Sequence, residues 1–135
     1  AGLYDLIAGL EAPICVASNS TRDRLERSLG HTPLWHHFAP HIYSGADMAH
    51  PKPAPDLIEH CLTTMSATAA HSIMIDDSPS GIRAAVAAGV PAIGFVTPGE
   101  TRPDSQQTLL DAGAIAIAHD ATSLDQILTS HAPAR

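Results

Sequence analysis

Short apolar runs alternate with longer amphipathic stretches along the chain. The short runs are rich in β-branched residues and are bounded by polar or turn residues, which predicts strands at residues 14–17, 41–44, 72–75, 92–96 and 114–118. Helical spacing of apolar residues predicts helices over residues 4–10, 22–30, 57–65, 79–88, 109–112 and 123–128. This alternation predicts an α/β fold with a mainly parallel sheet.

The segment 72–89 is the one around which the rest of the chain is arranged. Its apolar start predicts a strand buried on both faces of a parallel sheet. Ser78 is expected to cap the following helix, and Gly89 to close it in the left-handed conformation. Since the strand ends at Asp76 and Asp77, both carboxylates are expected at the sheet edge where α/β proteins bind ligands.

Adjacent aspartates at such an edge favour a bound cation. Two neighbouring carboxylates repel each other unless a cation or a basic group neutralises them. Mg²⁺ prefers one or two carboxylates together with waters and phosphate oxygens, so Asp76 and Asp77 fit the protein's share of a Mg²⁺ site. The alternative is structural, with Asp76 ending the strand and Asp77 capping the next helix.

Ser18 and Lys52 are two further candidates. Ser18 follows the apolar run 14–17, and its hydroxyl and the N–H groups of the next turn suit a phosphate oxygen, although an ordinary helix cap uses the same residue types. Lys52 is the only lysine of the sequence, and Pro53 restrains its backbone before the 57–65 helix. This lysine is well placed to reach inward, the alternative being a solvated loop lysine.

Length and charge limit the possible functions. The 135 residues suffice for one compact domain, taken as residues 1–135. A net charge of −7, with 7 Lys plus Arg, argues against a nucleic-acid partner. No apolar run reaches membrane-spanning length and no signal peptide is visible, so no membrane partner and a cytoplasmic location are expected.

Cysteine and histidine do not form a metal-binding pattern. Cys15 lies in a predicted strand and Cys61 in a predicted helix, and both are expected to be core thiols in a reducing compartment. The 9 histidines are scattered without zinc-site spacing, so they are expected to be exposed residues that titrate near pH 6.5.

Three segments together resemble motifs II, III and IV of the haloacid-dehalogenase-like hydrolases, in the branch of phosphatases and β-phosphoglucomutase-like enzymes. They are residues 18–20 (Ser-Asn-Ser), 52–56 (Lys-Pro-Ala-Pro-Asp) and 75–89 with its Asp-Asp-Ser-Pro-Ser-Gly start. The resemblance implies a Rossmann-like three-layer sandwich and Mg²⁺-dependent phosphoryl transfer from a small phosphorylated metabolite.

The same resemblance assigns roles to single residues. It implies that Ser18 and Asn19 bind the phosphoryl group and that Lys52 neutralises it, with Ser18 and Lys52 as the catalytic residues present. It also implies that Asp76 and Asp77 help to hold Mg²⁺.

One departure from the family pattern is large. Family members begin with a central strand that ends in Asp-x-Asp and supplies the nucleophile, whereas this sequence contains no Asp-x-Asp. The fold is therefore expected to be incomplete, with a gap between the strands that end at Ala17 and Ile75. As a fragment, the chain is expected to bind phosphate without turnover, while the intact parent hydrolyses a small phosphomonoester through an aspartyl-phosphate.

Two other functions remain open. A non-catalytic binding or interaction module could keep this fold without the nucleophile. A receiver-like signalling domain also combines an acidic pair, a hydroxyl residue and Lys-Pro, but it places the acidic pair first, whereas here Ser18 and Lys52 precede Asp76. The missing N-terminal segment, or another copy of the chain, is expected to be able to fill the gap in the sheet.

Overall fold

The structure is a computed structural model that describes residues 5–6, 9, 13–18, 27, 38, 41–96, 99 and 104–131. In chain order its strands and helices are β1 (Val16–Ser18), β2 (Ile42–Ser44), η1 (Gly45–Asp47), α4 (Asp56–Thr64), η2 (Ala69–His71), β3 (Met74–Asp76), α5 (Pro79–Ala87), β4 (Ala92–Phe95), α6 (Ser105–Ala112), β5 (Ala116–Ala118) and α7 (Ala121–His131). Here η denotes a short 3₁₀ helix.

All strand pairs are parallel, and they form two separate groups. β1 pairs with β2, while β3, β4 and β5 form a second sheet in that order. Among the described residues no ladder of backbone hydrogen bonds joins β1 to β3. The expected α/β class with parallel strands is confirmed, and the divided sheet agrees with an incomplete fold.

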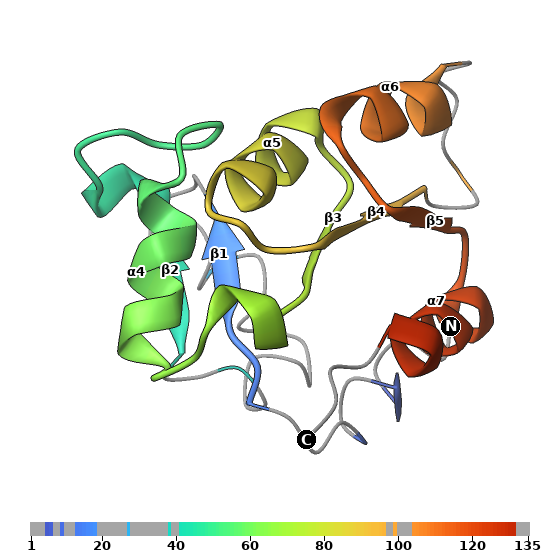
Figure 1. The fold of residues 1–135 in the computed structure, drawn as a ribbon, viewed down its shortest axis with the longest axis horizontal. Helices are drawn as coiled ribbons and strands as arrows, with labels where there is room; N and C mark the ends of the chain where they lie inside the picture. Colours follow the sequence, from blue (N-terminus) through green and yellow to red (C-terminus); the bar gives the residue numbers. More distant parts are fainter. Residues whose placement is uncertain are drawn as a thin grey trace.

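Helices cover both faces of the three-stranded sheet (Figure 1). α5 and α6 lie on one face, and α7 lies on the other. One apolar cluster joins α4, α5 and α6 to the first face, with Ile58, Ile82 and Leu109 among its buried members. A second cluster, which includes Ile93 and Leu124, joins α7 to the opposite face. These two clusters hold together a three-layer arrangement.

The expected ends of α5 are confirmed. The Ser78 hydroxyl accepts a hydrogen bond from the Gly81 N–H at 3.3 Å, and so caps the helix one residue before Pro79. At the other end Gly89 has a φ of +79°, the left-handed conformation that stops a helix.

The prediction that the strand at 72–75 is buried on both faces was wrong. Ile75, in the middle of β3, is 39% exposed. The reason is that, among the strands that the structure describes, β3 lies at the edge of its sheet and pairs with β4 alone. The last strand also begins later than predicted, because the Ala114 N–H bonds to Leu109 O and closes α6.

Most of the predicted helices at 4–10 and 22–30 lie outside the described residues. In the described part of the chain, each helix is too short or too polar to cross a bilayer.

Candidate functional site

Asp76 is held at the carboxyl end of β3 by hydrogen bonds to both of its carboxylate oxygens. Its Oδ1 accepts from the Ser78 backbone N–H at 3.0 Å and from the Ser78 hydroxyl at 3.3 Å. Its Oδ2 accepts from the Lys52 ammonium at 3.0 Å. The carboxylate therefore links the start of α5 to a loop far away in the sequence.

Lys52 bridges the two groups of strands. Its Nζ lies 3.0 Å from Asp76 Oδ2 and donates to the backbone carbonyl of Ala17 in β1 at 3.4 Å. The Lys52 side chain is 8% exposed and that of Asp76 is 12% exposed. The solvated loop position considered for this lysine is therefore wrong, since its side chain is buried and spans the gap between β1 and β3.

Ser18 and Asp77 lie at the carboxyl ends of the two strands that Lys52 connects. Ser18 is the last residue of β1 and follows Ala17, so it adjoins the carbonyl that Lys52 contacts. Asp77 is exposed and directly follows β3. The structure thus brings Ser18, Lys52, Asp76 and Asp77 to one end of the parallel strands. Asn19 lies outside the described residues.

Gly81 provides the space that the Asp76 carboxylate occupies. A Cβ at position 81 would lie 1.6 Å from Asp76 Oδ2 and 2.4 Å from its Cγ. Since no side chain fits there, the carboxylate can pack directly against the first turn of α5. The oxygen that meets this turn is the same one that binds Lys52.

The charges of the site suit an anion together with a divalent cation. One ammonium and the carboxylates of Asp76 and Asp77 sum to −1 (+1 − 1 − 1), and a divalent ion would change this to +1. Two adjacent carboxylates also match the oxygen ligands that Mg²⁺ takes from proteins, with waters and phosphate oxygens completing its shell. Across the described part of the chain, no group of three or more His, Cys, Asp or Glu side chains forms a metal cage.

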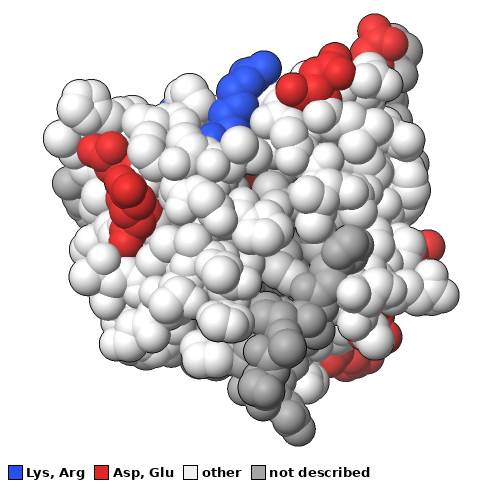
Figure 2. Space-filling view, in the orientation of Figure 1, with Lys and Arg blue, Asp and Glu red and all other residues white. Residues whose placement is uncertain are grey.

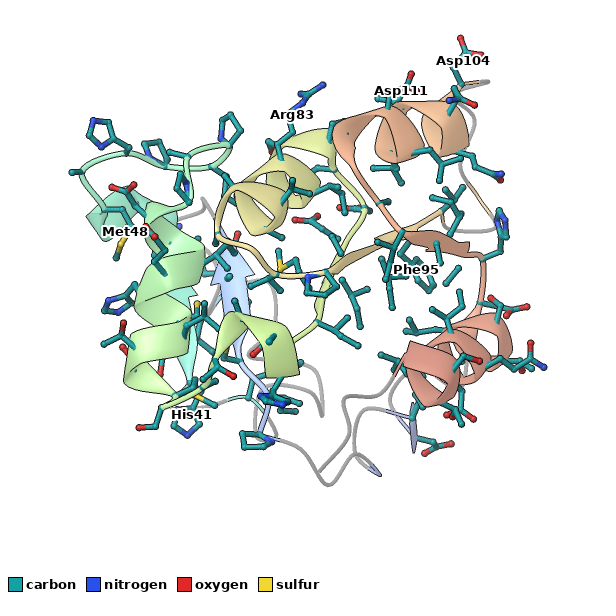
Figure 3. All side chains as sticks on the ribbon, viewed as in Figure 1. His41, Met48, Arg83, Phe95, Asp104 and Asp111 are labelled. Carbon is teal, nitrogen blue, oxygen red and sulfur yellow. The ribbon has the colours of Figure 1, made fainter. Side chains whose placement is uncertain are left out.

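The charged side chains on the surface seen in Figure 2 are distributed differently from those of the site. On this face acidic side chains lie in several separate places, and the described basic side chains do not gather into a patch. Figure 3 shows Arg83, on the same helix as Gly81, pointing away from the sheet. The positive charge of the site thus comes from a buried lysine.

Two residues of the site were not predicted as such. Ser78 was expected only to cap α5, yet its hydroxyl and N–H also fix Asp76. Gly81 was part of the motif but had no assigned role. A glycine in the first turn of a helix is unfavourable by propensity, and that was the available sign of a packing reason.

The fold and the site are those of an α/β protein that places its polar residues at the carboxyl ends of parallel strands. Residues 2–95 match the family of haloacid dehalogenase-like hydrolases, so the chain belongs to this family. The family resemblance read from the sequence is confirmed, which favours the hydrolase hypothesis over the receiver-like one.

Several relatives cover most of the chain. The 6-phosphogluconate phosphatase of Escherichia coli K12 is 30% identical over 102 residues, which are 76% of this chain and 46% of that protein. A conserved haloacid dehalogenase-like protein of Agrobacterium tumefaciens C58 has a TM-score of 0.90 at 33% identity, covering 96% of this chain and 59% of that one. The chain therefore spans about half the length of the curated relative.

A third relative was crystallised with ligands. It is a HAD family hydrolase of Deinococcus radiodurans R1 with bound phosphate and sodium, and it has a TM-score of 0.87 at 28% identity. The match covers 98% of this chain and 61% of that one.

Proposed function

We propose that the chain is the phosphate- and metal-binding part of a phosphatase that acts on a small phosphorylated metabolite. The observation that carries this proposal is the Lys52 ammonium, held between the Ala17 carbonyl and the Asp76 carboxylate at the gap between β1 and β3. A buried cation fixed from two sides is preorganised to neutralise a phosphoryl group.

Ser18 and Lys52 would act on the phosphoryl group together. The Ser18 hydroxyl, at the end of β1, would donate to one phosphate oxygen, and Asn19 would bind the same group. Lys52 would neutralise a second oxygen while Asp76 keeps its ammonium in place. Two relatives support phosphate as the kind of group that is bound, one named as a phosphatase and one crystallised with phosphate.

Mg²⁺ is the proposed cofactor, and Asp76 and Asp77 are its proposed ligands in this chain. The donor chemistry fits, because both residues offer carboxylate oxygens at one strand end. When bound, the ion would supply charge neutralisation for the phosphoryl oxygens. The hydrogen bonds from Ser78 fix the Asp76 carboxylate before any ion arrives.

We propose that the chain alone binds phosphate and Mg²⁺ but does not hydrolyse a phosphomonoester. The sequence contains no Asp-x-Asp, so the expected nucleophile and general acid are absent from it. In a longer protein, an apolar strand ending in Asp-x-Asp would fit between β1 and β3. The first aspartate of this motif would then form the aspartyl-phosphate. A second copy of the chain is the other proposed source of a strand at this edge.

The free cysteines Cys15 and Cys61 agree with a cytoplasmic location.

Calorimetric titration with inorganic phosphate, with and without Mg²⁺, tests the binding proposal. We expect phosphate to bind the 135-residue chain. Lys52→Met should abolish phosphate binding, whereas Asp77→Asn should weaken Mg²⁺ binding first. Arg83→Ala is the matched control, since Arg83 points into solvent and its loss should leave both affinities unchanged.

An assay of phosphate release tests the catalytic part. With 6-phosphogluconate and other phosphomonoesters, the chain should give only background release in Mg²⁺, and the parent protein that carries an Asp-x-Asp strand should turn over. Robust release of phosphate by the chain alone would refute the proposal that hydrolysis needs the Asp-x-Asp strand of the parent. Absence of both phosphate and Mg²⁺ binding would instead favour the non-catalytic interaction module.

A further inference from the structure

The Asp76 carboxylate has little freedom to rotate. Each of its oxygens has a different partner, with Ser78 on Oδ1 and Lys52 on Oδ2. The Ser78 hydroxyl also accepts from the Gly81 N–H and lies 3.2 Å from the Ser80 hydroxyl. The direction in which Asp76 holds Lys52 is therefore set by the first turn of α5.

Gly81 is unusual within this turn. Its φ is not positive, so the backbone does not require glycine at this position. Glycine is also among the poorest helix formers, so an alanine would favour the helix if space allowed. Space does not allow it, because the Cβ would lie 1.6 Å from Asp76 Oδ2. The glycine is therefore explained by the carboxylate and not by the backbone.

We propose that Gly81 is a positioning residue of the site, working with Ser78: its missing side chain lets the Asp76 carboxylate lie against α5 and hold the Lys52 ammonium between β1 and β3. That Lys52 then meets phosphate rests on the function proposed above. The anchoring itself depends only on the contacts of Gly81, Ser78, Asp76 and Lys52.

A double-mutant comparison tests the anchoring without any ligand. Gly81→Ala is made in the wild-type chain and in the Lys52→Met/Asp76→Gly background, which removes the buried lysine, the carboxylate and also the Asp76 Cβ, 3.1 Å from the added Cβ. We expect Gly81→Ala to lower the thermal unfolding midpoint in the wild-type chain. In the second background the clashing carboxylate is gone, so the same change should leave the midpoint unchanged or raise it.

Each outcome of this comparison decides the proposal. A loss of folding in the wild-type chain alone supports it, as does the expected reversal of sign. An equal loss in both backgrounds overturns it, because the clash would then not come from Asp76. Ala87→Gly, at an exposed position of α5, measures how far glycine and alanine differ in this helix.

The second readout uses the fact that Lys52 is the only lysine of the sequence. Reductive methylation at fixed pH, followed by peptide mass spectrometry, reports how accessible its amine is. We expect Gly81→Ala to raise the methylation rate of Lys52 several-fold, and Arg83→Ala to leave it unchanged. A rate in Gly81→Ala equal to that of the wild-type chain would overturn the positioning role.

A third variant separates the hydroxyl from the backbone. Ser78→Ala removes the hydroxyl that donates to Asp76 and should also raise the methylation rate of Lys52. Ser78→Thr keeps a hydroxyl, so its methylation rate should equal that of the wild-type chain.

Titration with inorganic phosphate separates this inference from the proposed function. If the wild-type chain does not bind phosphate but Gly81→Ala still shows the reversal of sign, the proposed function fails and the anchoring stands. If phosphate binds and Gly81→Ala binds it as tightly as the wild-type chain does, the positioning role is wrong.

Discussion

Lys52 and Asp76 are 24 positions apart in the sequence, yet their side chains form an ion pair of 3.0 Å with exposed fractions of 8% and 12%. Charged groups lose their hydration when they are buried to this extent, and the loss is offset only while both partners are present. The pair also spans the gap between the two groups of strands, since Lys52 reaches the Ala17 carbonyl of β1.

Lys52→Met should therefore destabilise the fold through the carboxylate that it leaves behind. We expect the free energy of unfolding to fall by about 3–5 kcal/mol, measured by urea denaturation. The matched control is Lys52→Met/Asp76→Ala, which removes both charges and should cost less than the single change. A double variant that is less stable than Lys52→Met would show that the stranded carboxylate is not the cause.

Gly94→Ala should overpack the core between β4 and α6. A Cβ at position 94 would lie 2.8 Å from Ile117 Cδ1 and 3.0 Å from Leu109 Cβ. Because closely packed side chains cannot yield without strain, we expect a loss of about 1–3 kcal/mol in the free energy of unfolding. Gly99→Ala is the control, since nothing lies within 4 Å of its added Cβ. Equal stabilities of the two variants would contradict this packing argument.

The two cysteines should react at different rates. A hydrogen bond with Cys61 lowers the pKa of Cys15, while the same bond and burial raise the pKa of Cys61. Since the thiolate is the reactive form, iodoacetamide should modify Cys15 before Cys61, as followed by peptide mass spectrometry. Cys61→Ala removes the donor and should slow the reaction of Cys15, whereas Cys61→Ser keeps a donor. Faster modification of Cys61 would contradict the assigned direction of the bond.

Asp120 should make the start of α7 sensitive to acid. Its carboxylate accepts a hydrogen bond from the Ser123 N–H at 2.7 Å, and this bond lowers the pKa of Asp120 below its ordinary 3.8. A lowered folded-state pKa means that the stabilisation is complete above the unfolded-state pKa and is lost as the pH falls through the lower folded value.

Asp120→Ala should thus lower the thermal midpoint at neutral pH and lessen the further loss below about pH 4. Midpoints recorded along a pH series provide the measurement. Gln126→Ala, at an exposed and uncharged position of the same helix, should keep the acid dependence of the wild-type chain. If the thermal midpoint of Asp120→Ala falls with pH as it does in the wild-type chain, other groups cause the acid dependence.

Local signals in the sequence predicted most elements of the fold. The cap at Ser78 and the left-handed Gly89 both act within a few residues, and both ends of α5 were predicted from them. Exposure of Ile75 could not be predicted in this way. It depends on which strands lie beside β3, and that is decided by contacts between distant segments.

The sequence by itself determined the α/β class, the order of the strands and longer helices that the structure describes, the family and the candidate residues at the strand ends, because propensity, capping and motif spacing are short-range properties. Only the tertiary structure decided that Lys52 is buried and paired with Asp76, and that Gly81 makes room for that carboxylate. The physical reason is that burial, ion pairing and steric fit depend on atoms that the folded chain brings together from loops, strands and helices remote in sequence.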